Sequence, residues 1–160
     1  MDYKLVEIES VPTNTRDPFK EISLVEIFKI CNKMERVCLE NGGIGLSAVQ
    51  VGLPWNLFVV QRNNFFEHYL NCVYEPSGEE ITSIEGCLSI RDEHDSIRRF
   101  ELKRYSSILV KGQRLLSDEG ISVQEFSSLE TGLYSIVFQH EIDHSFGIFI
   151  KDKGKEIYIS

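Results

Sequence analysis

The sequence predicts an α+β fold, in which helices flank a middle region of antiparallel strands. Residues 24–40 have the periodicity of an amphipathic helix, and a second helical pattern covers residues 128–146. Between them, residues 57–126 contain short segments typical of strands, at spacings that suit antiparallel meanders and not βαβ units. We find no internal repeat or linker, so residues 1–160 are expected to form one domain.

The first predicted helix begins after Ser23 and ends at residues 41–43. Ser23 and Glu26 form a capping box, and apolar residues follow at helical spacing. Those residues are Leu24, Ile27, Phe28, Cys31, Met34 and Cys38. The segment Asn-Gly-Gly is a typical stop signal. Residues 1–22 contain two prolines and are expected to be irregular.

The strand-rich region is marked by β-branched and aromatic residues between turn residues. The predicted strands are residues 57–60, 69–74, 81–84, 108–110 and 121–126. Residues 117–120 (Ser-Asp-Glu-Gly) resemble the tip of a hairpin.

The second predicted helix is expected to begin after Ser127, because Ser127 and Glu130 form another capping box. Gly147 is expected to end it, leaving a short tail over residues 148–160. The positions that share its predicted core-facing side are Leu129, Leu133, Ile136, Val137, His140 and His144.

The bulk composition is typical of a soluble globular protein, with 42% hydrophobic and 26% charged residues. A formal net charge of −8 argues against a protein that binds nucleic acid mainly through the phosphates, so no direct nucleic-acid binding is expected. No apolar run approaches the roughly 18–20 residues that span a bilayer, and no secretory signal is present, so no membrane association is expected. The cysteines show no C-x-x-C pair. These features favour the reducing cytosol.

The motif H-E-x-x-H lies in the second predicted helix. His140 and His144 are about one turn apart on one face, so they can bind the same divalent metal ion, and Glu141 can handle protons beside it. The alternative is a pair of core histidines hydrogen-bonded to Asp143 and Glu141, which is costly without a metal ion or a complete network. Asp143 is expected either to orient an imidazole or to hydrogen-bond within the core.

A catalytic metal site with two histidines needs a third protein ligand. His68 and His94 lie in polar stretches and are expected at the surface. Cys87 is a better candidate, because thiolate binds soft and borderline metals and Gly86 permits close backbone approach. We expect Cys87 to follow the end of a strand.

A glycine-rich segment covers residues 42–54 and contains one polar side chain, Gln50, among apolar neighbours. Taken alone, Gln50 would be a structural amide. No Lys-Ser or Lys-Thr pair follows the glycines, and there is no βαβ context, so a nucleotide phosphate loop is disfavoured.

Three segments together resemble the three motifs of the peptide deformylases: residues 43–50 (GIGLSAVQ), 85–89 (EGCLS) and 139–144 (QHEIDH). The resemblance extends from Gly43 to Gly147. It implies a roll-like α+β fold, with antiparallel strands around a central metal-binding helix. It also implies hydrolysis of the N-terminal formyl group from formyl-methionyl nascent polypeptides.

The resemblance also implies roles for individual residues. Cys87, His140 and His144 are expected to bind one divalent metal ion, commonly Fe(II) in the family, with Zn, Ni or Co as alternatives. Glu141 is expected to be the general base and acid. Gln50 and the backbone N–H of Leu88 are expected to face the oxyanion.

The resemblance also suggests where a formyl-Met peptide binds. Gly43, Ile44 and Gly45 could pair with the peptide as an added strand, and Gly86 lies beside them in the expected groove. The methionine side chain would occupy a pocket formed by Leu133, Ile136 and Val137, unless these three simply pack in the core. An arginine near this pocket would be Arg91, Arg98 or Arg99.

Some positions depart from the family pattern. Ser47 replaces the usual Ala, Arg91 stands where Pro is common, and residues 145–146 (Ser-Phe) replace the usual Leu and polar residue. The chain resembles short family forms that lack a C-terminal helix. Transient proximity to ribosomes is therefore expected, but not docking through such a helix. The expected location is the cytoplasm of a bacterial or phage-infected cell, with organelle stroma or matrix as an alternative. A metallopeptidase, a cysteine hydrolase using Cys87 and a non-catalytic metal-binding module are the alternative functions.

Overall fold

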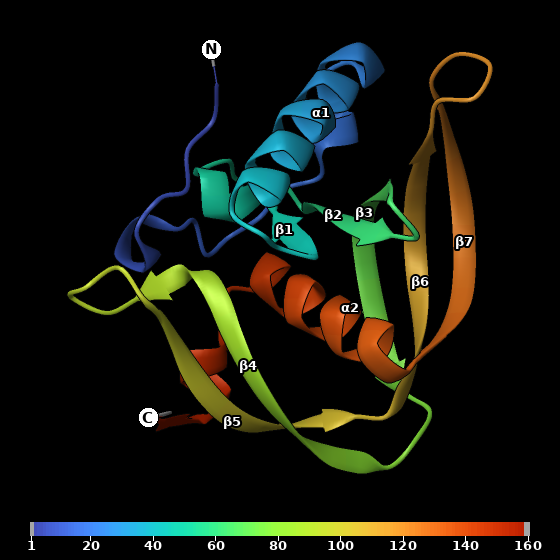
Figure 1. Cartoon of the computed structure of the whole chain (residues 1–160). Coiled ribbons are helices and arrows are strands. Elements are labelled where there is room, and N and C mark those ends of the chain that lie inside the picture. The colour runs from blue at the N-terminus through green and yellow to red at the C-terminus, as the bar shows by residue number, and fades with distance from the viewer. Residues whose placement is uncertain (1, 159–160) are drawn as a thin grey trace.

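Two antiparallel sheets surround the helix α2 in the computed structural model, which describes residues 2–158 (Figure 1). The five-stranded sheet has the order β1-β2-β3-β6-β7, and the three-stranded sheet has the order β4-β5-β8. The strands are β1 (Gly45–Ser47), β2 (Leu57–Arg62), β3 (Phe65–Pro76), β4 (Glu80–Arg91), β5 (Ile97–Tyr105), β6 (Ser107–Leu116), β7 (Ser122–Thr131) and β8 (Lys155–Ile157). The α+β prediction, with antiparallel strands rolled around a central helix, is confirmed.

Helix α1 (Leu24–Glu40) agrees with the prediction at both ends. The Ser23 hydroxyl accepts a hydrogen bond from the backbone N–H of Glu26, and Gly42 adopts a left-handed conformation with φ of 69° just beyond the C-cap. The apolar face of α1 is buried against β1 and β2, so the chain is anchored where it enters the glycine-rich segment. That segment contains β1 and the single-turn 3-10 helix η3 (Ala48–Val51). Two more such turns, η1 (Ile8–Ser10) and η2 (Pro18–Lys20), precede α1.

The five predicted strands are present, but three strands were missed. β1 and β8 have only three residues each, which is too short for a periodic signal. β5 is longer, with buried residues Phe100, Leu102 and Arg104 alternating with charged ones. The buried arginine interrupts the apolar alternation by which strands are recognised. The tail is also more ordered than expected, because α3 (Ile150–Lys153) and β8 follow α2; residues 159 and 160 lie outside the described part.

The predicted start of the second helix is wrong. β7 continues to Thr131, with Ser127 opposite Lys111 of β6, and α2 covers Gly132–Ser145. Ladder hydrogen bonds with β6 therefore outweigh the local capping signal at residues 127–130. Gly132, with φ of 60°, provides the abrupt change from strand to helix. As a result Leu129 and Leu133, predicted to face the core, are 60% and 55% exposed.

Helix α2 contacts both sheets, so more than one of its faces is buried. Phe138 and Ile142 pack with Phe58 and Tyr69 of the larger sheet. His140 and His144 lie nearer the smaller sheet, whose residue Glu85 contacts His140. Gly147 follows the helix with φ of 75°, as predicted for its C-terminal stop. Among the described residues, no helix is long and apolar enough to cross a membrane.

Strand β4 is interrupted by a bulge that is central to the site. Gly86 pairs with Arg99 and Arg91 pairs with Ile97, so residues 87–90 of β4 face only Arg98 of β5. Such bulges redirect side chains and commonly lie beside active sites. Here the extra residues turn Cys87 and Leu88 toward α2 and the glycine-rich segment.

Candidate metal centre and active site

Cys87, His140 and His144 converge at the centre of the molecule. Their ligand atoms lie within 4.8 Å of one another, and the Cys87 Sγ is 3.8 Å from the His144 Nε2. The predicted triad is therefore brought together by the fold, although Cys87 lies inside β4 and not after a strand as expected. Cys87 and His144 are almost completely buried, and His140 is partly exposed to the adjoining cavity.

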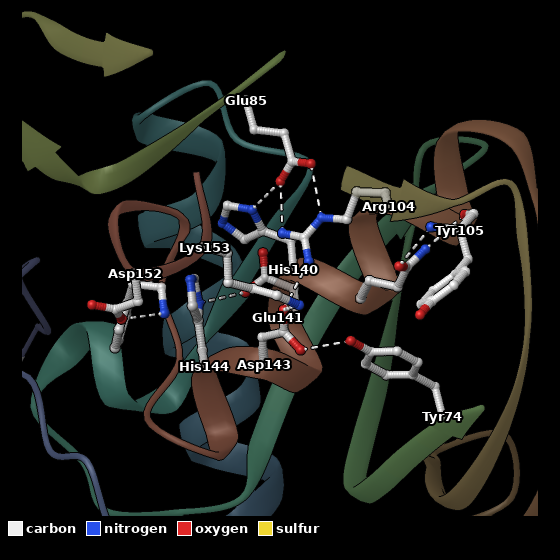
Figure 2. Close-up of polar contacts among 12 residues, drawn as sticks. Tyr74, Glu85, Arg104, Tyr105, His140, Glu141, Asp143, His144, Asp152 and Lys153 are labelled. Carbon is white, nitrogen blue, oxygen red and sulfur yellow. Dashed lines mark hydrogen bonds and ion pairs between the residues drawn. The ribbon is translucent and has the colours of Figure 1, made fainter. Parts of the chain in front are cut away.

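His140 is oriented by an ionic network that the sequence did not reveal (Figure 2). Its Nδ1 lies 2.9 Å from Glu85 Oε1, which leaves Nε2 for a metal ion. Arg104 donates to both oxygens of Glu85, at 2.9 and 2.8 Å, and to Asp143 Oδ2 at 2.7 Å. Burial raises the pKa of Glu85, but the hydrogen bonds from Arg104 and His140 outweigh it and hold that pKa well below its usual range.

Of the two roles expected for Asp143, the structure shows hydrogen bonding within the core. It accepts hydrogen bonds from the Tyr74 hydroxyl, at 2.8 Å, and from the Lys153 ammonium group, at 3.1 Å, besides the one from Arg104. Glu85, the first residue of the EGCLS segment, supplies the carboxylate that orients an imidazole. The available signal for Arg104 in the sequence was its position in an alternating pattern, two residues after Leu102 and four after Phe100, both of which are apolar.

His144 is held mainly by packing. The Phe149 ring stacks on its imidazole with centroids 4.5 Å apart and planes 25° apart. Its Nδ1 and the Glu141 Oε1 are buried without a hydrogen-bond partner, although the two atoms are 3.3 Å apart. Burial lowers the pKa of His144 to about 3, so its imidazole is neutral and able to bind a metal ion.

Glu141 lies against the glycine-rich segment. A Cβ atom on Gly45 would be 2.9 Å from Glu141 Oε2, so the absence of a side chain at residue 45 makes room for the carboxyl group. Burial raises the pKa of Glu141 to about 7, against the opposing effects of His140 and Arg104. The carboxyl group is thus close to both histidines without being among the three converging ligands.

Gln50 lies in η3 and joins the glycine-rich segment to the β4 bulge. Its Oε1 accepts from the Ser47 backbone N–H at 2.9 Å, so its amide group has a fixed orientation. Its Nε2 then points to Ser89 Oγ, at 3.2 Å, and Cys87 Sγ, at 3.4 Å. The amide N–H groups are therefore directed toward Ser89 and toward Cys87, one of the three candidate metal ligands.

A cavity of about 370 Å³ is bordered by Cys87 and His140, two of the three candidate metal ligands. Its lining includes every residue predicted to bind substrate: Gly43, Ile44, Gly45, Gly86, Leu133, Ile136 and Val137. Gln50, Leu88 and Glu141 line it as well. Of the three candidate arginines, Arg99 borders this cavity, whereas Arg91 and Arg98 border a second cavity of about 450 Å³ near the N-terminal segment.

The two other histidines are not part of the site. His94 is exposed in the turn between β4 and β5, as expected. The surface prediction for His68 is wrong, because its side chain in β3 is buried and contacts Glu35 of α1. Pairing with a carboxylate allows this histidine to be buried in a sheet.

The donor set fits a divalent metal ion. Burial raises the pKa of the Cys87 thiol to about 12, so a thiolate here requires a nearby positive charge. His144 is neutral, and His140 presents one ring nitrogen to Glu85 and the other toward the ligand cluster. Three converging ligands are the number typical of catalytic metal sites, whereas structural sites usually have four.

A metal centre of this kind, with a buried carboxyl group and an amide facing one cavity, defines a metal-dependent hydrolase. The family model described as polypeptide deformylase matches residues 8–158. The chain belongs to the polypeptide deformylase family.

Individual relatives agree with this assignment. The peptide deformylase of Carboxydothermus hydrogenoformans is 33% identical over 157 residues, covering 97% of this chain and 95% of the relative. A probable peptide deformylase from Synechococcus phage S-SSM7 matches with a TM-score of 0.79 and 27% identity, covering 95% of this chain and 99% of the other. The peptide deformylase of Thermotoga maritima matches with a TM-score of 0.77 and 25% identity, covering 96% and 97%.

The contact between Glu85 and His140 gives a testable prediction. Glu85→Gln removes the negative charge that pairs with Arg104 and should weaken metal binding by about 10- to 100-fold, as is typical when the partner of a ligating histidine is changed. Competition with a chromophoric chelator measures the affinity. Glu101→Gln, at an exposed position of β5, is the matched control and should bind metal normally. Equal affinities in the two variants would remove this role from Glu85.

Proposed function

We propose that this protein removes the N-terminal formyl group from formyl-methionyl nascent polypeptides and releases formate. The observation that carries the proposal is one cavity bordered by Cys87 and His140 of the candidate metal triad, by Glu141 and Gln50, and by apolar residues of α2. The membership in the polypeptide deformylase family supports it. We further take residues 1–160 to be a single catalytic domain.

Cys87, His140 and His144 would bind the divalent metal ion. When bound, such an ion lowers the pKa of water and polarises a carbonyl group. Fe(II) is the ion we propose, because thiolate and imidazole ligands suit it; the same donors also accept Zn, Ni or Co. Anaerobic purification followed by elemental analysis, coupled to a formate-release assay, identifies the active form.

The protein side chains provide proton transfer and charge stabilisation. Glu141 takes a proton from the attacking water and passes it to the amine nitrogen that leaves the formyl carbon. The carbonyl oxygen becomes negative as the tetrahedral state forms, and the Gln50 amide and the Leu88 backbone N–H donate to it. Gln50 is held ready for this by its hydrogen bond with Ser47.

The substrate would lie along the glycine-rich segment. Gly43, Ile44 and Gly45 offer backbone hydrogen-bonding groups to an extended peptide, opposite Gly86. Leu133, Ile136 and Val137 would contact the methionine side chain. Of the three candidate arginines, Arg99 is the one that borders this cavity, beside Gly86. We further propose a cytoplasmic location and transient proximity to ribosomes, where such peptides emerge.

The alternative functions are separated from this one by substrate and by chelation. Formyl-Met peptides should yield formate, and their unformylated counterparts should stay intact. Cleavage of internal peptide bonds would instead indicate a metallopeptidase. Activity that survives chelation and is blocked by thiol alkylation would indicate a cysteine hydrolase, which the raised pKa of Cys87 disfavours.

Gln50→Ala should lower kcat by about 100- to 1000-fold, because one preorganised oxyanion donor is lost. The KM for a formyl-Met tripeptide should change far less. Gln124→Ala, at an exposed position of β7, is the control for a glutamine change and should behave like the wild type. A Gln50→Ala enzyme with normal kcat would show that another group stabilises the oxyanion.

A further inference from the structure

Arg91 is a charged residue beside the site that the proposed mechanism does not use. It is the last residue of β4 and directly follows the bulge that contains Cys87 and Leu88. Its side chain is about three-quarters buried, with 26% of its surface exposed, and it borders the second cavity instead of the one beside the metal ligands.

The bulge needs support because it is outside the regular ladder of β4 and β5. Residues 87–90 have no one-to-one partners in β5, yet they provide the Cys87 thiol, the Leu88 N–H and the Ser89 hydroxyl that contacts Gln50. Backbone polar groups that lack ladder partners adopt a single conformation only if other groups bind them.

Arg91 supplies such a contact. Its Nε donates to the Leu88 carbonyl oxygen at 2.9 Å, and its Nη1 donates to the Asp95 carbonyl oxygen at 3.1 Å. Asp95 lies in the turn between β4 and β5, which Asp92 stabilises by accepting from the backbone N–H groups of His94 and Ser96. The planar guanidinium group therefore connects the bulge to a turn that has its own hydrogen bonds.

We propose that Arg91 is a positioning residue that fixes Leu88, so that its backbone N–H is held in place for the developing oxyanion. Resting on the function proposed above, this assigns Arg91 an effect on the chemical step and not on metal or substrate binding. The hydrogen bond to the Leu88 carbonyl restrains rotation of the backbone at Leu88. A catalytic donor displaced by about 1 Å can cost up to about 100-fold in rate.

The test compares Arg91→Ala and Arg91→Lys with the wild-type holoenzyme. Arg91→Ala should lower kcat on a formyl-Met tripeptide by about ten-fold, with KM, metal content and Tm close to those of the wild type. Arg91→Lys keeps the charge but has a single donor nitrogen, so it should recover part of the loss. Asp95→Asn is the matched control. Arg91 donates to the backbone carbonyl of Asp95, which this substitution keeps. The substitution removes only the charge of the Asp95 carboxylate, which is 3.7 Å from Arg91 and largely exposed.

Two results would overturn the inference. One is a kcat for Arg91→Ala that equals the wild-type value. The other is a loss of kcat that follows a parallel loss of metal or Tm, since that indicates a general structural role. Either result is distinct from failure of the proposed function, in which the wild-type protein itself would release no formate from formyl-Met peptides.

Discussion

Replacing Glu141 by alanine is expected to lower kcat at least about 100-fold while the metal ion stays bound. Glu141 is not one of the three converging ligands, and its carboxyl group fills the space left by the missing side chain of Gly45. Its loss therefore removes the proton carrier and leaves Cys87, His140 and His144 intact. Formate release gives kcat, and elemental analysis of the same sample gives metal content.

Glu119→Ala is the control for this change, because Glu119 is exposed at the tip of the β6–β7 hairpin. It should match the wild type in both measurements. Near-normal turnover by Glu141→Ala would mean that a different group moves the proton. Loss of the metal ion along with turnover would instead make Glu141 a contributor to metal binding.

Replacing Cys87 by alanine should abolish both metal binding and formate release, the largest combined effect expected for one substitution. Two imidazoles alone form an incomplete site. Among the described residues, Cys87, His140 and His144 are the one group of three or more side chains placed to bind a metal ion. Equilibrium dialysis with Zn or Co, followed by elemental analysis, measures the stoichiometry. The activity assay is then run on the same preparation.

Cys31→Ala provides the comparison, since Cys31 is also a buried cysteine but belongs to the core face of α1. It should lower Tm somewhat through the cavity it creates and retain one metal ion per chain. If Cys87→Ala also retains a full complement of metal with activity, the thiol is not a ligand and the proposed centre is wrong.

Short-range signals in the sequence predicted those parts of the fold that local chemistry controls. The Ser23 cap, the glycine stops after both long helices and the hairpin at residues 117–120 depend on a few neighbouring residues, and each was placed correctly. The capping box at Ser127 failed because pairing with β6, formed by residues about twenty positions earlier, continues the strand to Thr131. The intrinsic conformational preferences of residues 127–130 carry no information about pairing with another strand.

The site shows the same division. The spacing of His140 and His144 predicted a shared face, and the motif around Cys87 predicted the third ligand through the family resemblance. The partner of His140 could not be inferred locally, because Glu85 and Arg104 come from two strands whose pairing is set by the tertiary fold. The same holds for the stacking of Phe149 on His144, since it depends on the path of the chain after Gly147.

The buried Arg104 has a consequence for how the protein acquires its metal ion. Arg104 and Lys153 carry two positive charges against the carboxylates of Glu85 and Asp143, so this cluster is balanced by the protein's own groups. Arg104 links strand β4 to helix α2 through Glu85 and Asp143, and neither carboxylate is one of the three proposed metal ligands. We therefore expect metal loading to follow folding and ions to exchange in the native state, unlike in zinc fingers, which fold only when they bind metal.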